Sequence, residues 1–94
     1  MRFDSGTTDV PSATTRVQIS NTSDRVKAID VRGRPGNTGN IFFGVSDVTA
    51  TNGWTLQPGE SISITFGEGS AKFADFYVDA ATSGDDVDWS VVLL

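Results

Sequence analysis

The chain has 94 residues, of which 37% are hydrophobic and 20% charged, so it is polar but able to form one compact domain. It contains no cysteine and no histidine, which excludes a disulfide framework, the usual Cys/His zinc site and nucleophiles activated by histidine. The net charge of −5 argues against a general nucleic-acid binder or a binder of anionic membranes. We therefore expect no nucleic-acid or membrane partner.

Residues 1–14 follow no periodic pattern and contain few apolar side chains, among them Phe3 and Val10. We expect this segment to be an extended arm, flexible on its own, and residues 15–94 to be the folded domain. In this interpretation Phe3 and Val10 each fill a pocket on a partner, and the backbone between them adds a strand to an exposed sheet edge.

Alternation of apolar and polar residues predicts strands in the next part of the chain, separated by turn-forming segments at 21–24 and 33–40. Asn52-Gly53 predicts a tight turn, and Trp54–Leu56 is long enough only for a short bridging strand. The expected strands are 16–20, 27–32 and 41–45, with the inward-facing residues Val17, Ile19, Ile29, Val31, Ile41, Phe43 and Val45.

The second half predicts three further strands by the same alternation. They are 61–66, 76–80 and 87–93, with the inward-facing residues Ile62, Ile64, Phe66, Phe76, Val78, Ala80, Val87, Trp89, Val91 and Leu93. Six main strands joined by short loops predict an all-β fold, an antiparallel β-sandwich of jelly-roll or immunoglobulin-like topology. A small closed barrel is the alternative.

Charge is unevenly distributed along the sequence. Residues 1–46 hold six basic and four acidic side chains, and residues 47–94 hold one basic and eight acidic ones. One group of basic residues stands out and is either a docking patch for an acidic protein surface or a solvated face: Arg25, Lys27, Arg32 and Arg34.

Two groups of carboxylates are candidate chemical sites. Asp85, Asp86 and Asp88 lack the spacing of an EF-hand loop, and a turn whose Asp side chains cap backbone amides is favoured over a Ca²⁺ site. Glycoside hydrolysis needs two carboxyl groups flanking a cleft, for which a sandwich of this size has little room. The carboxylates considered for it were Glu60, Glu68, Asp75 and Asp79. We expect no enzymatic activity, no cofactor and no metal.

The runs 37–44, 52–61 and 75–85 resemble small structural proteins of tailed bacteriophages. The resemblance implies a capsid decoration (cement) protein on the outside of the virion head, made in the cytoplasm of the bacterial host. Its partner would be the major capsid protein, whose subunit contacts it would stabilise. The alternative is a carbohydrate- or receptor-binding module of a tail, baseplate or head fibre, which Trp54 and Tyr77 exposed together on a concave face would favour.

The C-terminal strand also predicts self-association. Val92 and Leu94 share the face opposite the predicted core, so they need to be covered by a neighbour or by the protein's own fold. We expect a homo-oligomer, and the resemblance favours a trimer because cement proteins commonly occupy three-fold positions.

Overall fold

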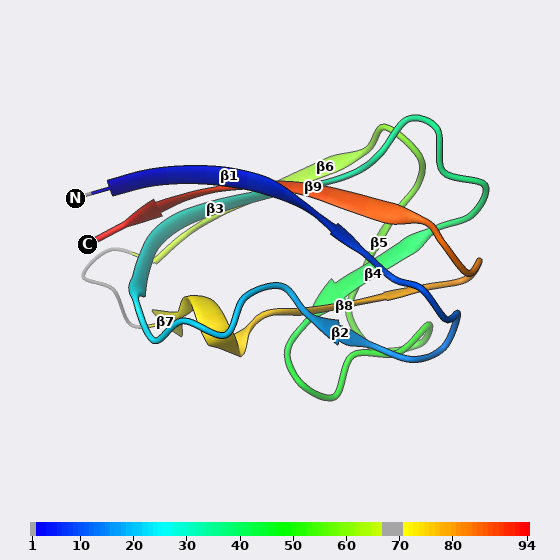
Figure 1. Ribbon diagram of the computed structural model, residues 1–94, viewed down its shortest axis with the longest axis horizontal. Helices are drawn as coiled ribbons and strands as arrows, with labels where there is room; N and C mark the ends of the chain where they lie inside the picture. Colours follow the sequence, from blue (N-terminus) through cyan, green and yellow to red (C-terminus); the bar gives the residue numbers. More distant parts are fainter. Residues whose placement is uncertain (1, 67–70) are drawn as a thin grey trace.

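The computed structural model describes residues 2–66 and 71–94, which form two antiparallel sheets packed face to face (Figure 1). The first sheet has the strand order β1-β9-β3-β6, with β7 also pairing with β3, and the second has the order β2-β8-β4-β5. The predicted all-β antiparallel sandwich is confirmed. The elements are β1 (Arg2–Asp9), β2 (Val17–Gln18), β3 (Arg25–Gly33), β4 (Ile41–Gly44), β5 (Trp54–Leu56), β6 (Ser61–Thr65), β7 (Ala71–Lys72), the 3₁₀ turn η1 (Phe73–Asp75), β8 (Tyr77–Ala80) and β9 (Asp86–Leu93).

The pairing of the strands decides between the two topologies that the sequence left open. Apart from the two-residue β7, the strands pair from the ends of the chain inwards: β1 with β9, β2 with β8, β3 with β6 and β4 with β5. β9 then also pairs with β3, and β8 with β4. A long hairpin wound around itself has this nested order, which is a jelly roll. In an immunoglobulin-like sandwich the first two strands share a sheet, whereas here β1 and β2 lie in different sheets.

The core lies between the two sheets and consists largely of the residues that alternation predicted. Ile29 and Val31 of β3 are buried with Val87 and Val91 of β9, and Phe43 of β4 stacks on Phe76 with ring centroids 5.7 Å apart. Ile62, Ile64 and Phe66 are half-buried instead of buried and pack against the border of this core. The first sheet ends at β6 in the described residues, which leaves these three side chains partly uncovered.

A β-bulge explains why alternation in the third strand is imperfect. Val26 and Ile29 are both buried although three positions separate them, which a regular strand cannot achieve. The pairing with β9 shifts at this point, because Val26 faces Leu93 while Ala28 faces Val92. The extra residue, Lys27, restores the inward direction for the rest of β3.

The predicted inward position of Val45 is wrong. β4 ends at Gly44, and Val45 begins a turn in which its carbonyl accepts a hydrogen bond from the amide of Val48 at 2.9 Å. Val48 is fully buried in its place, while Val45 is 52% exposed. Gly53, with φ of +136°, closes the same loop where a Cβ would lie 2.7 Å from Val48 Cγ2.

The expected N-terminal arm is instead the edge strand of the first sheet. Residues 2–9 form β1, which pairs with β9 from Arg2↔Leu93 to Asp9↔Asp86, so that both ends of the chain lie at the same end of the molecule (Figure 1). Trp89 supports this strand, since its Nε1 donates a hydrogen bond to Thr8 Oγ1 at 3.1 Å. Within residues 2–66 and 71–94, no helix is long and apolar enough to span a membrane.

Candidate functional site

The outer face of the first sheet is ordered in rows that run across the strands. Residues that face each other in the register share a face, so the row at the chain ends combines Phe3, Val92 and Ala28. The following rows are polar and consist of Ser5, Ser90, Asp30 and Ser63, then Thr7, Asp88, Arg32 and Ser61. The face therefore changes along the strands from apolar to hydroxyl-lined to charged.

The apolar end brings together three of the residues predicted to bind a partner. Phe3 is 69% exposed and lies beside the half-buried Val92, while Leu94, directly after the end of β9, is 52% exposed. Leu94 is held there by a hydrogen bond from its amide to the carbonyl of Arg25 at 3.0 Å. Two distant parts of the sequence thus build one apolar patch, which we call the terminal patch (Phe3, Val92 and Leu94).

The charged end is a network of ion pairs. Arg32 contacts Asp88 at 2.6 Å, and Arg34 contacts Asp88 at 3.5 Å and Asp86 at 3.8 Å. Although burial alone would raise the pKa of Asp88, hydrogen bonds from Arg32 and Thr7 and the arginine charges lower it below its ordinary value. These arginines are already engaged by carboxylates of the same sheet.

The carboxyl group of Asp86 has the opposite shift. Burial raises the pKa of Asp86, and the hydrogen bond and the charge of the facing Asp9 raise it further, against the lowering effect of Arg34. Two carboxyl groups therefore oppose each other where β1 ends and β9 begins, and the proximity of Asp9 disfavours the charged form of Asp86.

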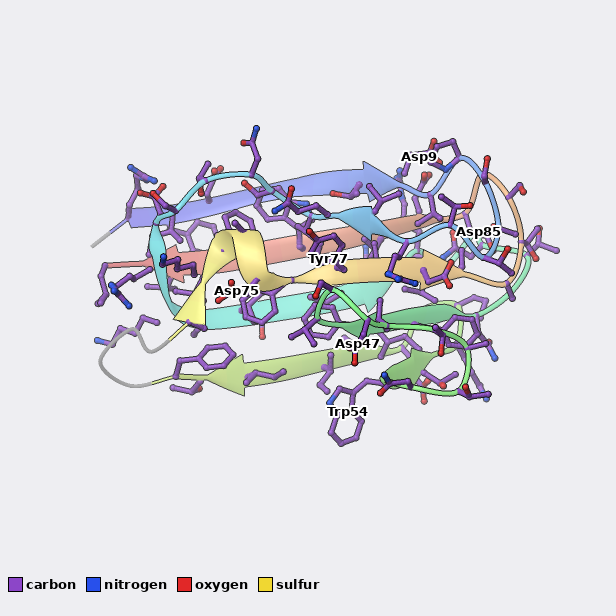
Figure 2. The ribbon with its side chains drawn as sticks, turned by 90° about the horizontal axis from the view of Figure 1, so that it is seen from below. Asp9, Asp47, Trp54, Asp75, Tyr77 and Asp85 are labelled. Carbon is purple, nitrogen blue, oxygen red and sulfur yellow. The ribbon has the colours of Figure 1, made fainter. Side chains whose placement is uncertain are left out.

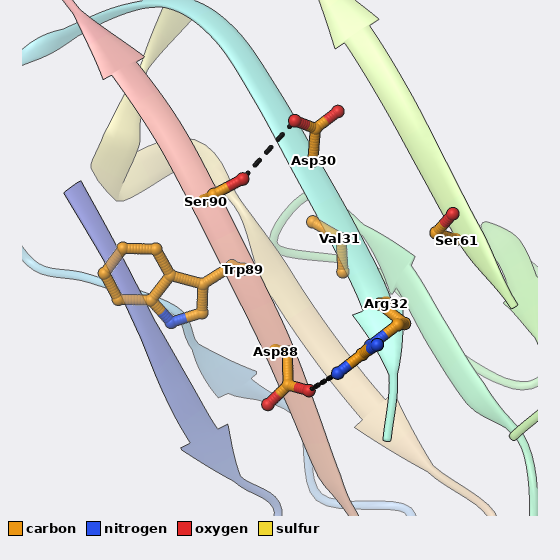
Figure 3. Close-up of a pocket in the computed structure, with 7 residues that line it drawn as sticks. All are labelled: Asp30, Val31, Arg32, Ser61, Asp88, Trp89 and Ser90. Atoms are coloured by element: carbon orange, nitrogen blue, oxygen red, sulfur yellow. Dashed lines mark hydrogen bonds and ion pairs between the residues drawn. The ribbon is translucent and has the colours of Figure 1, made fainter. Parts of the chain in front are cut away.

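Between these two ends the face carries a shallow groove of about 190 Å³ (Figure 3). Ser90 donates a hydrogen bond to Asp30 Oδ2 at 3.3 Å on one side of it, and Arg32 pairs with Asp88 on the other. Small-molecule pockets usually have roughly 300–1,000 Å³, so this face is nearly flat. A flat face of this kind suits contact with another protein better than enclosure of a small ligand.

The edge of this sheet is the second feature of the site. In the part of the chain that the structure describes, β1 pairs only with β9, which leaves the hydrogen-bonding groups along its other edge without a strand partner. The strand is regular over eight residues and contains no proline, and its charged residues are Arg2, Asp4 and Asp9. An edge of this length can accept a strand from another chain.

The structure differs from the sequence-based prediction of the partner-binding surface at Val10 and in the grouping of the basic residues. Val10 is fully buried. Two backbone hydrogen bonds hold it in place: its amide donates to the Asp85 carbonyl at 3.0 Å, and its carbonyl accepts from the Gly84 amide at 2.8 Å. It belongs to the core and is not accessible to a partner. The four basic residues are also not one cluster, because Arg25 and Lys27 lie at the start of β3, whereas Arg32 lies near its end and Arg34 directly follows it.

The acidic turn before β9 behaves as an amide cap. Asp85 is buried, and its carboxylate accepts hydrogen bonds from the amides of Thr38 and Gly39 at 3.0 and 2.8 Å. This confirms the capping interpretation for Asp85 and joins the β8–β9 turn to the β3–β4 loop. Asp85 and Asp9 lie at the end of the molecule opposite the terminal patch (Figures 1 and 2).

Three of the carboxylates considered for glycoside hydrolysis can be placed. Glu60 accepts a hydrogen bond from the Gln57 amide at 2.8 Å, and Asp75 accepts one from the Lys72 amide at 2.9 Å. Both therefore fix local turns. Asp79 lies on the outer face of the second sheet, and Glu68 falls outside the described residues.

The two aromatic residues considered for sugar stacking do not form one platform. Trp54 faces Phe43 and Tyr77 faces the next residue, Gly44, so the register directs the two side chains to opposite faces of the second sheet. Trp54 is 61% exposed and projects from the edge of the molecule, away from Tyr77 (Figure 2).

Comparison with known proteins leaves the chain without an assigned family. No protein-family model matches it, and no curated protein matches it. Among solved structures, a chain from Bacillus endospore appendages, described as "a novel family of disulfide-linked pili", has a TM-score of 0.49 and 21% identity over 96% of this chain and 84% of that chain. A similarity of this degree assigns neither a family nor a function.

Proposed function

We propose that the protein is a non-enzymatic structural protein that docks onto a larger protein assembly through the β1 edge and the terminal patch. The observation that carries the proposal is the eight-residue edge strand β1, one side of which is unpaired among the described residues, together with the exposed Phe3 on this strand and the exposed Leu94. Following the resemblance to phage structural proteins, we propose that the assembly is a bacteriophage head and the partner its major capsid protein.

Docking would combine two kinds of contact. A strand of the partner would extend the first sheet along β1, so that backbone hydrogen bonds supply affinity. Phe3 and Leu94 would fill apolar recesses beside that strand and supply specificity. Binding to the assembled shell in preference to free subunits would stabilise the shell by mass action. In this proposal three copies surround a three-fold position of the shell, and the head surface is the site of the protein in the virion.

The copy number of the protein in purified virions tests where it acts. Quantitative mass spectrometry should find hundreds of copies for each particle if the protein covers the head. A handful of copies would contradict head decoration and would instead favour the tail or baseplate alternative.

A matched pair of variants tests the docking surface. Phe3→Ser should weaken the affinity for undecorated capsids at least about tenfold, and so lower their occupancy at protein concentrations below saturation, since truncating a hot-spot anchor of an interface costs more than ~1.4 kcal/mol. Val45→Ser is the control, because Val45 is also exposed, at 52%, but lies in the loop after β4. Occupancy is measured by sedimentation followed by mass spectrometry. Equal occupancy for Phe3→Ser and the wild type would contradict docking through the terminal patch.

A further inference from the structure

A pocket of about 420 Å³ lies on the outer face of the second sheet, away from the proposed docking surface. Its floor is formed by Phe42 of β4 and Asp79 of β8, which face each other in the register. Its rim comes from two loops, the β1–β2 connection at Thr14 and the β4–β5 loop at residues 49–51. This volume lies within the range of small-molecule sites.

The two floor residues are buried although they point away from the core. Alternation places Ile41, Phe43 and Val78 inward, so Phe42 and Asp79 face outward, yet they are only 8% and 4% exposed. The two loops that fold over the sheet at this point cover them. The chain thus encloses a carboxylate on a face that would otherwise be open to solvent.

The carboxylate of Asp79 has spare hydrogen-bonding capacity. Its Oδ1 accepts a hydrogen bond from the Ala80 amide at 2.8 Å, and Oδ2 has no partner among the described residues. Every fully buried side-chain oxygen of the described residues does have a partner, so Oδ2 must reach open space, and the open space beside Asp79 is the pocket. No basic side chain of the described segments lies within 4.0 Å of this carboxylate.

The rim supplies hydroxyl groups. Thr49 and Thr51 bring their hydroxyl oxygens within 3.3 Å of each other. The Thr14 hydroxyl donates to the Ala13 carbonyl, and its lone pairs remain able to accept. Thr14 has a φ of +64°, a conformation that is strained for a β-branched residue, and a hydrogen bond from its amide to the Ala80 carbonyl holds it there.

We propose that this pocket binds a single ring of a neutral sugar, with Asp79 Oδ2 accepting hydrogen bonds from its hydroxyl groups. The Thr49–Thr51 hydroxyl pair would donate to and accept from further hydroxyls of the ring. Phe42 and Ala50 would contact its less polar face. This inference goes beyond docking and does not depend on it, because the two surfaces lie on different sheets.

The composition of the pocket favours a sugar over a small organic cation. An alkylammonium group could donate to the carboxylate and to the threonine oxygens, but it has no lone pair to accept a hydrogen bond from the threonine hydroxyls. A sugar hydroxyl both donates and accepts, so it can satisfy the carboxylate and the threonine hydroxyls together. The walls also combine apolar and hydroxyl groups, as the two surfaces of a sugar ring require.

An NMR titration of the full chain labelled with ¹⁵N tests this proposal. The probes are glucose, galactose, mannose and N-acetylglucosamine, each added to 50 mM, with n-butylammonium chloride as the cationic probe. At least one sugar should shift the amide signals of residues 49–51 and 79–81 saturably, with a dissociation constant of about 1–20 mM. Absence of such shifts with all four sugars, or shifts with n-butylammonium alone, would overturn the proposal.

Three variants separate ligand binding from a purely structural role. Asp79→Asn should weaken the binding of the sugar that responds at least tenfold and leave the midpoint of thermal unfolding unchanged or higher, because it removes a buried charge. Asp47→Asn is the control on the same β4–β5 loop, at a position that does not line the pocket, and should change the affinity less than twofold. Ala50→Leu fills the pocket from an exposed loop position and should abolish the shifts even if Asp79→Asn does not fold. Unchanged affinity in Ala50→Leu would place the ligand elsewhere.

Discussion

Gly6 determines how closely β1 can approach Trp89. It faces Trp89 across the strand pair, and a Cβ at this position would lie 2.6 Å from Trp89 Cζ2. The indole ring is itself packed edge-on against Phe73 with ring centroids 5.0 Å apart, so it has little room to move. We expect Gly6→Ala to lower the free energy of unfolding by about 1–3 kcal/mol, measured by urea denaturation.

Gly36→Ala is the matched control for this prediction. An added Cβ at Gly36 meets no atom within 4 Å, and no strained φ requires glycine there. The free energy of unfolding should therefore change by less than about 0.5 kcal/mol. If both variants lose the same stability, the loss reflects a general cost of replacing glycine and not contact with Trp89.

Single residues of the core could be predicted from the sequence, whereas the floor of the Asp79 pocket could not. Ile29, Val31 and Val91 follow from alternation alone, since each lies on a strand with one buried face. Phe42 and Asp79 are buried by loops that cross the outer face, which local periodicity does not describe. The one signal was the uninterrupted apolar run 41–43, which is typical of a strand covered on both faces.

At the scale of elements, the sequence of β1 does not indicate a strand, because its inward positions are polar. Arg2, Asp4, Gly6 and Thr8 share the face of Leu93 and Val87, so they point toward the second sheet. On this side the second sheet offers only the two-residue β2 as its edge strand. Polar inward positions are therefore tolerated, and the amphipathic pattern that would reveal a strand is absent.

Removal of residues 2–9 tests whether β1 is part of the folded domain. The deletion exposes Trp89 and the edge of β9, so we expect the free energy of unfolding to fall by about 3 kcal/mol or more, a large share of the 5–15 kcal/mol typical of a domain. Chemical denaturation of the deleted and complete chains measures this. A deletion that leaves the stability unchanged would contradict the structure and restore the interpretation of a flexible arm.

The carboxyl pair at the far end of β1 and β9 gives a pH dependence of defined sign. Because the pKa of Asp86 is raised in the folded state, the folded chain holds this proton more tightly, and stability falls as pH rises from about 3.8 through the raised value. Asp86→Asn should therefore increase the free energy of unfolding at pH 7 by up to about 0.5 kcal/mol and change it little at pH 3. Urea denaturation at both values measures the difference.

Asp88 provides the control of opposite sign. Its pKa is lowered in the folded state, so its contribution to stability is present above about pH 3.8 and is lost as the pH falls toward the lowered value. Asp88→Asn should reduce the free energy of unfolding at pH 7 by about 1 kcal/mol or less, given the partial exposure of its ion pairs. A loss of stability at pH 7 in Asp86→Asn would show that its contact with Arg34 outweighs the repulsion by Asp9.

At the scale of the whole molecule, the sequence predicted a sandwich but not its winding. Alternation reports which face of a strand is buried, and it carries no information on which strands pair. Here the pairs join residues as distant as Arg2 and Leu93, so the roll is set by long-range fit between strands. Proximity in sequence is equally misleading for Arg25 and Arg32. They are only seven positions apart but lie at opposite ends of one extended strand, β3.

The nested pairing of the strands also governs how the protein can form during synthesis. Among the described strands, β1 is made before the others and pairs only with β9, which is made after them and separates β1 from β3 in the sheet. The first sheet therefore closes only after translation reaches Leu93, while the local hairpin of β4 and β5 can form earlier. Until then β1 has no strand partner in the nascent chain. We expect binding to a chaperone, or pairing with a neighbouring chain, to occur most readily in this interval.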